Sequence, residues 1–220
     1  MRARSLVRLH PLYKAVLVCL VLVPLSAVPL RAASGSNHDW NYEETRSDAR
    51  EFTAGGFVHV RLSVGDMHIK RGDTNKISLR YTIKSRREKN VKDATVDFDV
   101  HGSEANIEFH APSSANTQFD VELEVPEKTN LYVHDKVGDM TVEDVEGDKD
   151  LSLGVGDIRV ANGRAGYRLV NASTGIGDVN SDGYDGETKG WLGKTLKYHG
   201  DGKYELRAHV GVGDINLEGK

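Results

Sequence analysis

Apolar and polar residues alternate with a period of two along most of residues 56–135. Five runs place apolar side chains on one face and polar or charged side chains on the other, the pattern of a half-buried β-strand. No stretch after residue 33 has a capped, amphipathic 3.6-residue period, so we expect an all-β protein. The five runs are Val58–Leu62, Ile77–Ile83, Val96–Val100, Ile107–Phe109 and Phe119–Val125.

A six-residue motif with Gly-Asp at its second and third positions recurs along the chain. Glycine-to-glycine spacings from Gly138 are 18, 21, 16 and 20 when a degenerate copy, Leu192–Lys197, is included. The period is therefore near twenty residues. The five full copies are Val64–Ile69, Val137–Val142, Val155–Val160, Ile176–Ser181 and Val212–Leu217, and their turn residues are Gly65, Asp66, Gly138, Asp139, Gly156, Asp157, Gly177, Asp178, Gly213 and Asp214.

Apolar residues occupy positions 1, 4 and 6 of the motif, and a straight strand cannot place positions 1 and 4 on the same side. We therefore expect a corner at Gly-Asp, where glycine accepts unusual backbone angles and aspartate bonds nearby amides. Two short strands per period predict a right-handed parallel β-helix or β-solenoid in the C-terminal half, preceded by a longer-stranded region. An antiparallel sandwich is the alternative, but it would not require such a regular Gly-Asp.

The N-terminus has the order of an export signal. Residues 1–14 are basic, 15–30 are apolar, and small residues follow, so cleavage after Ala27, Ala32 or Ser34 fits. An uncleaved anchor is the alternative, although sixteen residues with two prolines fall short of the ~20 that span a bilayer. We expect a signal peptide at 1–33, a polar linker or cap at 34–55 and one domain at 56–220. The location would be the periplasm, cell surface or extracellular space, without stable membrane insertion after cleavage.

Charge and cysteine content narrow the function. Residues 1–33 hold five basic residues and no acidic one, which leaves 24 basic and 33 acidic residues, a net charge of −9. Such a chain is a poor nucleic-acid or anionic-membrane binder, because phosphate contacts need clustered Lys and Arg. Cys19 is the only cysteine and lies in the apolar run, so disulfides, thiol chemistry and cysteine-bound metals are excluded from the rest.

The motif resembles the repeats of bacterial exported proteins that carry the "putative adhesin" domain of unknown function, which read Val-Gly-Asp-Ile-x-Val. The segment Val125-Pro-Glu-Lys-Thr-Asn-Leu131 leads into the repeats in the same way, and the resemblance covers about 56–220. It implies a right-handed β-helix-like fold, an envelope location and no established enzymatic activity. Two residues depart from the family pattern: Lys194 stands where aspartate is usual, and Ser181 lies at an inward position.

The repeated aspartates Asp139, Asp157, Asp178 and Asp214 would line one corner about 5 Å apart if the coils stack in register. One hypothesis is a row of calcium sites; the other is that each carboxylate caps its own turn. We favour capping, because Lys194 would then lie between Asp178 and Asp214 and repel a metal. We predict no metal and no cofactor.

Two further surfaces are candidates for contacts. A stacked row of aromatic rings could bind sugars, although the same rings could fill corners of the coil. The basic stretch 84–92 is interpreted as an exposed loop between strands. The aromatic residues in question are Tyr167, Tyr184, Trp191, Tyr198 and Tyr204.

No nucleophile elbow, phosphate loop or metalloprotease motif occurs. We therefore expect an exported structural or binding module of the adhesin-like kind, without catalytic residues, whose partner is an envelope protein or a glycan. The alternative is a carbohydrate-active lyase or glycosidase on a β-helix. The last repeat ends near Lys220 without a cap, so we also expect homo-oligomers through the C-terminal coil.

Overall fold

The computed structural model describes residues 40–219 except 74, 113–115 and 185. The expected signal peptide lies outside the described residues. Sixteen strands and one short α-helix form the described part, which belongs to the compact unit His38–Lys220. The elements before the tight repeats are β1 (Tyr42–Glu51), β2 (Phe57–Arg71), β3 (Lys76–Ser85), α1 (Glu88–Asp93), β4 (Thr95–His101), β5 (Glu104–His110) and β6 (Thr117–Val125).

The repeat region adds ten shorter strands and one 3₁₀ turn, Arg164–Gly166. Its strands alternate between two sheets, except that Glu187–Lys189 and Thr195–His199 lie in the same sheet as the strand that follows them, so each of the four Gly-Asp coils contributes one strand to each sheet. The strands are β7 (Asn130–Val137), β8 (Met140–Glu143), β9 (Lys149–Val155), β10 (Ile158–Ala161), β11 (Tyr167–Ile176), β12 (Val179–Asp182), β13 (Glu187–Lys189), β14 (Thr195–His199), β15 (Tyr204–Val212) and β16 (Ile215–Glu218).

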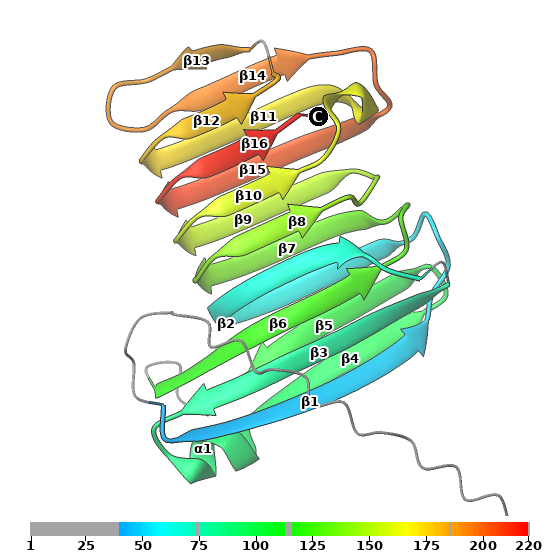
Figure 1. The fold of residues 1–220 in the computed structure, drawn as a ribbon, viewed down its shortest axis with the longest axis vertical. Coiled ribbons are helices and arrows are strands. Elements are labelled where there is room, and N and C mark those ends of the chain that lie inside the picture. The colour runs from blue at the N-terminus through cyan, green and yellow to red at the C-terminus, as the bar shows by residue number, and fades with distance from the viewer. Residues whose placement is uncertain (1–39, 74, 113–115, 185, 220) are drawn as a thin grey trace, which may run out of the picture. The chain divides into compact units, whose positions relative to one another are not determined.

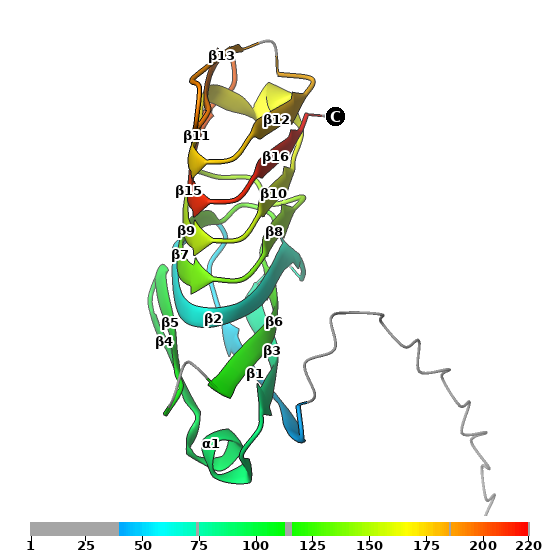
Figure 2. The same ribbon diagram turned by 90° about the vertical axis from the view of Figure 1, so that its left-hand side faces the viewer.

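Two sheets face each other and share the bent strand β2 (Figures 1 and 2). Sheet A has the order β12-β16-β10-β8-β2-β6-β3-β1, and sheet B has the order β13-β14-β11-β15-β9-β7-β2-β5-β4. The pairs within the repeats are parallel, whereas β1, β3, β4, β13 and β14 pair antiparallel with their neighbours. The all-β fold and its β-solenoid-like repeats are thus present.

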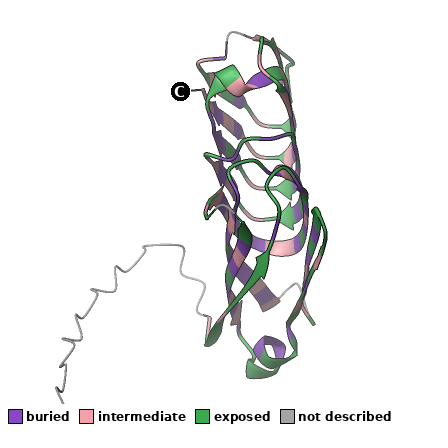
Figure 3. Ribbon diagram, turned by 90° about the vertical axis from the view of Figure 1, so that its right-hand side faces the viewer, coloured by how far each residue is buried: buried purple, intermediate pink, exposed green. Residues whose placement is uncertain are grey.

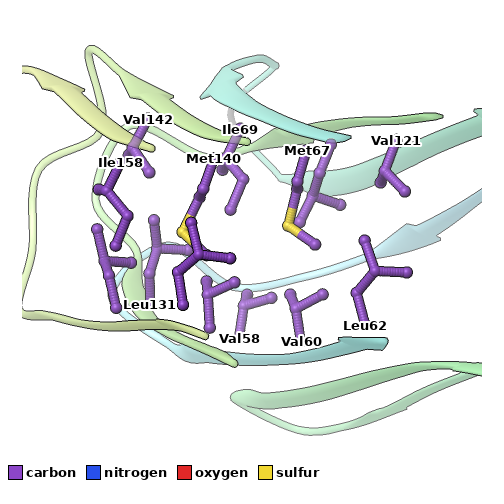
Figure 4. Close-up of a cluster of buried hydrophobic side chains, with 14 of the residues drawn as sticks. Val58, Val60, Leu62, Met67, Ile69, Val121, Leu131, Met140, Val142 and Ile158 are labelled. Atoms are coloured by element: carbon purple, nitrogen blue, oxygen red, sulfur yellow. The ribbon is translucent and has the colours of Figure 1, made fainter. Parts of the chain in front are cut away.

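The core lies between the sheets, and buried and exposed residues alternate along the strands (Figure 3). Figure 4 shows side chains from opposite sheets meeting there, with Val58 and Val60 of β2 on one side and Met67 and Met140 on the other. These four side chains are at most 2% exposed. The period-two pattern of residues 56–135 predicted these buried faces correctly, because each strand has one face on the core.

Each Gly-Asp pair of the later four copies joins a strand of sheet B to a strand of sheet A, while Gly65-Asp66 is the bend of β2. The backbones approach closely here. A Cβ on Gly138 would lie 1.7 Å from the oxygen of Gly65, and its φ of 144° is one that side chains disfavour. Glycine is therefore required both by conformation and by the contact between coils.

The aspartates cap the neighbouring coil rather than their own turn. The amide of Asp139 donates to Oδ1 of Asp66 at 3.1 Å, and the amide of Asp157 donates to Oδ1 of Asp139 at 3.0 Å. The ladder continues from the amide of Asp214 to Asp157 and from the amide of Asp178 to Asp214, both at 2.8 Å. One corner of the stack is therefore linked by carboxylate-to-amide bonds.

The coils do not stack in chain order. The last repeat, β15 and β16, lies between β9/β10 and β11/β12, with parallel partners on both sides. The degenerate copy is not a coil, because Thr195–His199 forms β14, which pairs antiparallel with β11. Because β14 occupies the outer edge of β11, the last repeat lies at its inner edge, between β11 and β9.

This order overturns two expectations. Asp178 and Asp214 are direct neighbours, so Lys194 does not lie between them; its amide instead bonds Oγ1 of Thr174 at 3.0 Å. The C-terminal coil has parallel partners on both sides and is not an open end, so the expectation of an uncovered last repeat is wrong.

In two segments the observed secondary structure also differs from the one expected from the sequence. Residues 42–51 form β1 along the edge of sheet A rather than an irregular linker. The basic stretch contains helix α1, whose residue Val91 is buried, rather than only a loop. Both segments are rich in charged residues, so their sequences alone do not predict regular structure. Each is ordered because it packs against β3.

Replacing Asp157 with alanine removes the acceptor of the Asp214 amide and should lower the free energy of unfolding by about 0.5–2 kcal/mol. Asp178→Ala is the matched control. Within the described residues no amide donates to the Asp178 carboxylate, so this variant should unfold like the wild type in urea. Equal losses in the two variants would contradict the directional ladder.

Deleting residues 204–220 should remove an inner coil, not trim an end. We expect β11, β12 and β14 to lose their support, because coils in such stacks are stabilised by their nearest neighbours. Limited proteolysis should then cut within 163–199 while a fragment covering 40–161 stays protected. Protection of 163–199 in the truncated protein would show that the insertion is wrong.

Candidate functional site

The parallel register places side chains of successive coils in straight rows on the outer faces. On sheet B one row runs through His59, Tyr132, Asp150, Arg207 and Asn171. These residues come from five strands that are far apart in the sequence. The outer faces are therefore composite surfaces, and each coil contributes one side chain to a row.

An aromatic group stands at one end of this row. The rings of His59 and Tyr132 stack at 4.9 Å with an interplanar angle of 13°, and the ring of Phe57 lies 6.1 Å from that of Tyr132. Phe57 and Tyr132 are each 37% exposed. Because β7 lies between β2 and β9, the Tyr132 face away from His59 is directed toward the strand of Asp150.

A hollow of about 200 Å³ lies beside this ring, and we call it the aromatic notch. Asp150 is exposed, and its carboxylate makes no hydrogen bond or ion pair with other described residues. The notch thus combines an accessible aromatic ring with an acceptor that has no competing partner. Its lining residues are His59, Val60, Arg61, Tyr132, Val133, His134, Asp150 and Ser152.

A larger and more open groove of about 770 Å³ lies on the outer face of sheet A. Several of its charged groups already have partners. His68 Nε2 lies 2.9 Å from Glu143 Oε2, and Lys84 forms an ion pair with Asp120. A ligand would have to displace these contacts, which makes the groove the weaker candidate.

Two buried ionisable groups interrupt the apolar interior. Lys149, 2% exposed, donates to the carbonyls of Val145 at 2.6 Å and Gly147 at 3.1 Å and lies 5.1 Å from the Tyr167 ring centre. Burial lowers the pKa of Lys149 to about 7, although Asp148 and Glu146 oppose this shift. From the interior, the Lys149 ammonium thus bonds two backbone carbonyls of the turn between β8 and β9.

Asp135 is the second such group and lies between Leu62 and Leu153 in an inward row. It is 0% exposed. Burial raises its pKa to about 7, while hydrogen bonds from the backbone amides of Lys136 and Val137 act in the opposite direction. Its Oδ1 accepts from the Lys136 amide at 2.6 Å, and Oδ2 has no partner among the described residues.

The candidate aromatic row does not form. Tyr167 and Tyr184 are 2% and 4% exposed, Tyr184 packs edge-on against Tyr198 at 5.3 Å, and Trp191 stands apart at 95% exposure. For the two buried tyrosines, the packing alternative is therefore the correct one. Burial also raises the pKa of Tyr184 to about 12.

The aromatic notch was missed because its members are scattered along the chain. His59 lies more than seventy residues before Tyr132, and only the strand register brings the two together. Alternation did place His59 on an outward face, but nothing in the sequence pairs it with a tyrosine. Among residues 40–219 with the stated gaps, no group of three His, Cys, Asp or Glu side chains is arranged to hold a metal ion.

The comparisons with known proteins agree with this architecture. Residues 58–191 match the family described as Toastrack DUF4097. The chain belongs to this Toastrack family. The resemblance to the "putative adhesin" family is thereby confirmed, whereas no curated protein matches this Toastrack chain.

Three solved structures are similar to this Toastrack protein. A "putative cell adhesion protein" from Clostridium sporogenes is 16% identical with a TM-score of 0.49, over 80% of this chain and 100% of that one. A "putative adhesin" from Parabacteroides merdae is 11% identical with a TM-score of 0.30, over 79% and 81%. A "putative lipid binding protein" from Parabacteroides distasonis is 11% identical with a TM-score of 0.29, over 80% and 97%. None is similar enough to assign a function to this chain.

Asp135 should make stability depend on pH. Its pKa is about 7 in the folded state against 3.8 for the free side chain, so the folded state binds the extra proton between these values. Stability should therefore fall as pH rises from about 4 to 7, by ~4 kcal/mol at most. Asp135→Asn should remove this part of the pH dependence in urea denaturation and stabilise the protein at pH 8.

The control for this experiment is Asp99→Asn, which changes an exposed aspartate on the edge strand β4. It should keep the wild-type pH profile. If Asp135→Asn has the same profile as the wild type, the buried carboxyl is not the titrating group.

Proposed function

We propose that this Toastrack protein is an exported, non-catalytic binding module of the bacterial envelope, and that the aromatic notch holds a sugar ring of an envelope glycan. The observation that carries the proposal is the exposed Tyr132 ring beside the unpaired Asp150 carboxylate. An aromatic face packs well against the C–H face of a pyranose, and a carboxylate accepts hydrogen bonds from its hydroxyls.

The lining favours binding over hydrolysis. Glycosidases of the usual kind need two carboxyl groups about 5–9.5 Å apart across the scissile bond. Asp150 is the one carboxylate among the residues that line the notch. The lyase or glycosidase alternative therefore has less support than simple recognition.

Export and the right-handed sense of the coil belong to this proposal as well. The basic, apolar and small-residue order of residues 1–33 supports export. No helix among the described residues is long and apolar enough to cross a membrane. The straight rows of outward side chains form an elongated surface, which suits binding to an extended polymer such as a glycan.

The first test is a melting-temperature screen of residues 38–220 against peptidoglycan fragments, O-chains and capsular polysaccharides, because a ligand of the folded state raises the midpoint. Tyr132→Ala should weaken the Kd of a positive glycan by about tenfold or more, since it removes the stacking face. Asp150→Asn should also weaken it. Tyr42→Ala, an exposed aromatic on β1, is the control and should bind normally.

Three results would overturn the proposal. The first is the absence of any midpoint shift, and the second is unchanged affinity in Tyr132→Ala. The third is release of shorter or unsaturated sugar products during incubation, which would make the protein an enzyme. Chromatography of the incubated glycan distinguishes this third result from binding.

A further inference from the structure

The first position of the repeated motif is exposed in four of its five copies and half-buried at Val64, although the sequence pattern placed it with the core. Nine large hydrophobic residues are exposed in the described part of the chain, and six of them lie together beside the Gly-Asp corners. These are Val137 (44%), Val155 (48%), Val212 (46%), Ile176 (51%), Leu192 (62%) and Trp191 (95%).

The register aligns these side chains into one line. Val64 pairs with Val137, Val137 with Val155, Val155 with Val212, and Val212 with Ile176. Four steps of about 4.8 Å give a line about 19 Å long. Leu192 extends it, because its carbonyl accepts from the Gly177 amide at 3.4 Å, and Trp191 precedes it in the chain. We call these seven residues the lateral stripe, and Figure 2 looks onto this side.

Close stacking of the coils keeps the lateral stripe uncovered. Glycine follows every one of the five aligned residues, and glycine also precedes three of them, at Gly154, Gly175 and Gly211. A Cβ on Gly154 would lie 2.4 Å from the oxygen of Lys136, so a covering side chain cannot be accommodated there. Backbone without side chains therefore flanks the stripe.

A purely structural role explains the stripe incompletely. β-Branched residues favour extended backbone and pack in cross-strand pairs, which helps the coils to stack. Threonine has the same branching and would suit a half-exposed position better, yet all five copies carry Val or Ile. A continuous apolar patch of this kind marks an interaction surface.

The size of the stripe argues against a second copy as the occupant. A stable protein interface uses about 20–30 residues on each side, whereas the lateral stripe has seven. A narrow apolar line that ends in an exposed tryptophan suits the boundary of a lipid layer, where indole rings prefer to lie. The adjacent aspartates Asp66, Asp139, Asp157, Asp178 and Asp214 would repel anionic headgroups.

We propose that the lateral stripe docks onto the interfacial region of an uncharged or zwitterionic lipid surface, with Trp191 and the aligned aliphatic side chains entering between the headgroups. Binding should be weak and reversible, no stronger than the order of 10⁴ M⁻¹ known for a single acyl anchor. The proposal does not depend on the aromatic notch, because the two surfaces share no residue.

The experiment uses residues 38–220, the compact unit that contains both sheets and omits the apolar N-terminal segment. Trp40→Phe leaves Trp191 as the sole tryptophan. Its emission should shift to shorter wavelength with phosphatidylcholine vesicles, and the protein should float with them. Binding to phosphatidylglycerol vesicles at low salt should be weaker.

The deciding variant is Val155→Thr with Val212→Thr, which keeps the branched shape but adds two hydroxyls. It should reduce vesicle partitioning about tenfold, while circular dichroism and melting show an intact fold. Val100→Thr, a partly buried valine on β4, is the matched control and should partition normally.

Three results would overturn the proposal. The wild-type unit does not float with neutral vesicles, or the double variant floats as well as the wild type. The third result is a dimer of the wild-type unit in light scattering that is absent in the double variant, because a second copy of the protein would then occupy the stripe. Tyr132→Ala should leave flotation unchanged, so failure of the glycan proposal is distinguishable.

Discussion

The close contact between the Gly-Asp corners of neighbouring coils is the constraint on which the rest of the stack depends. Glycine brings the backbones together, and four of the five aspartates, Asp66, Asp139, Asp157 and Asp214, then accept the amide of the coil beside them. This linkage sets a common register for every strand that enters or leaves a corner. The straight rows on the outer faces, including the aromatic notch and the lateral stripe, follow from that register.

The inserted C-terminal coil completes the ladder rather than ending it. Asp214 accepts from Asp178 and donates its own amide to Asp157, so the last repeat joins coils that would otherwise be separate. Antiparallel strands stand at three of the four sheet ends, namely β1 on sheet A and β4 and β13 on sheet B, whereas the other end of sheet A is the parallel strand β12. Charged edge strands such as β1 limit edge-to-edge pairing.

The interior tolerates one lysine and one aspartate because each lies near a turn where backbone groups can bond it. Lys149 donates to two carbonyls of the return turn, and Asp135 accepts an amide near the Gly-Asp corner. Asp135 is the costlier of the two, since one of its oxygens has no partner among the described residues. Its protonation links the stability of the stack to pH without involving either proposed binding surface.

The sequence by itself determined the all-β class, the strands of residues 56–135 and the Gly-Asp corners, because period-two burial and glycine conformation are local properties. Only the tertiary structure decided the order of the coils, since the repeats are alike and the edge of β11 is already taken by β14. It also decided that position 1 of the motif is exposed in four of the five copies, because neighbouring glycines cannot cover it. The notch needed the structure too, as His59 and Tyr132 meet only through strand pairing between distant segments.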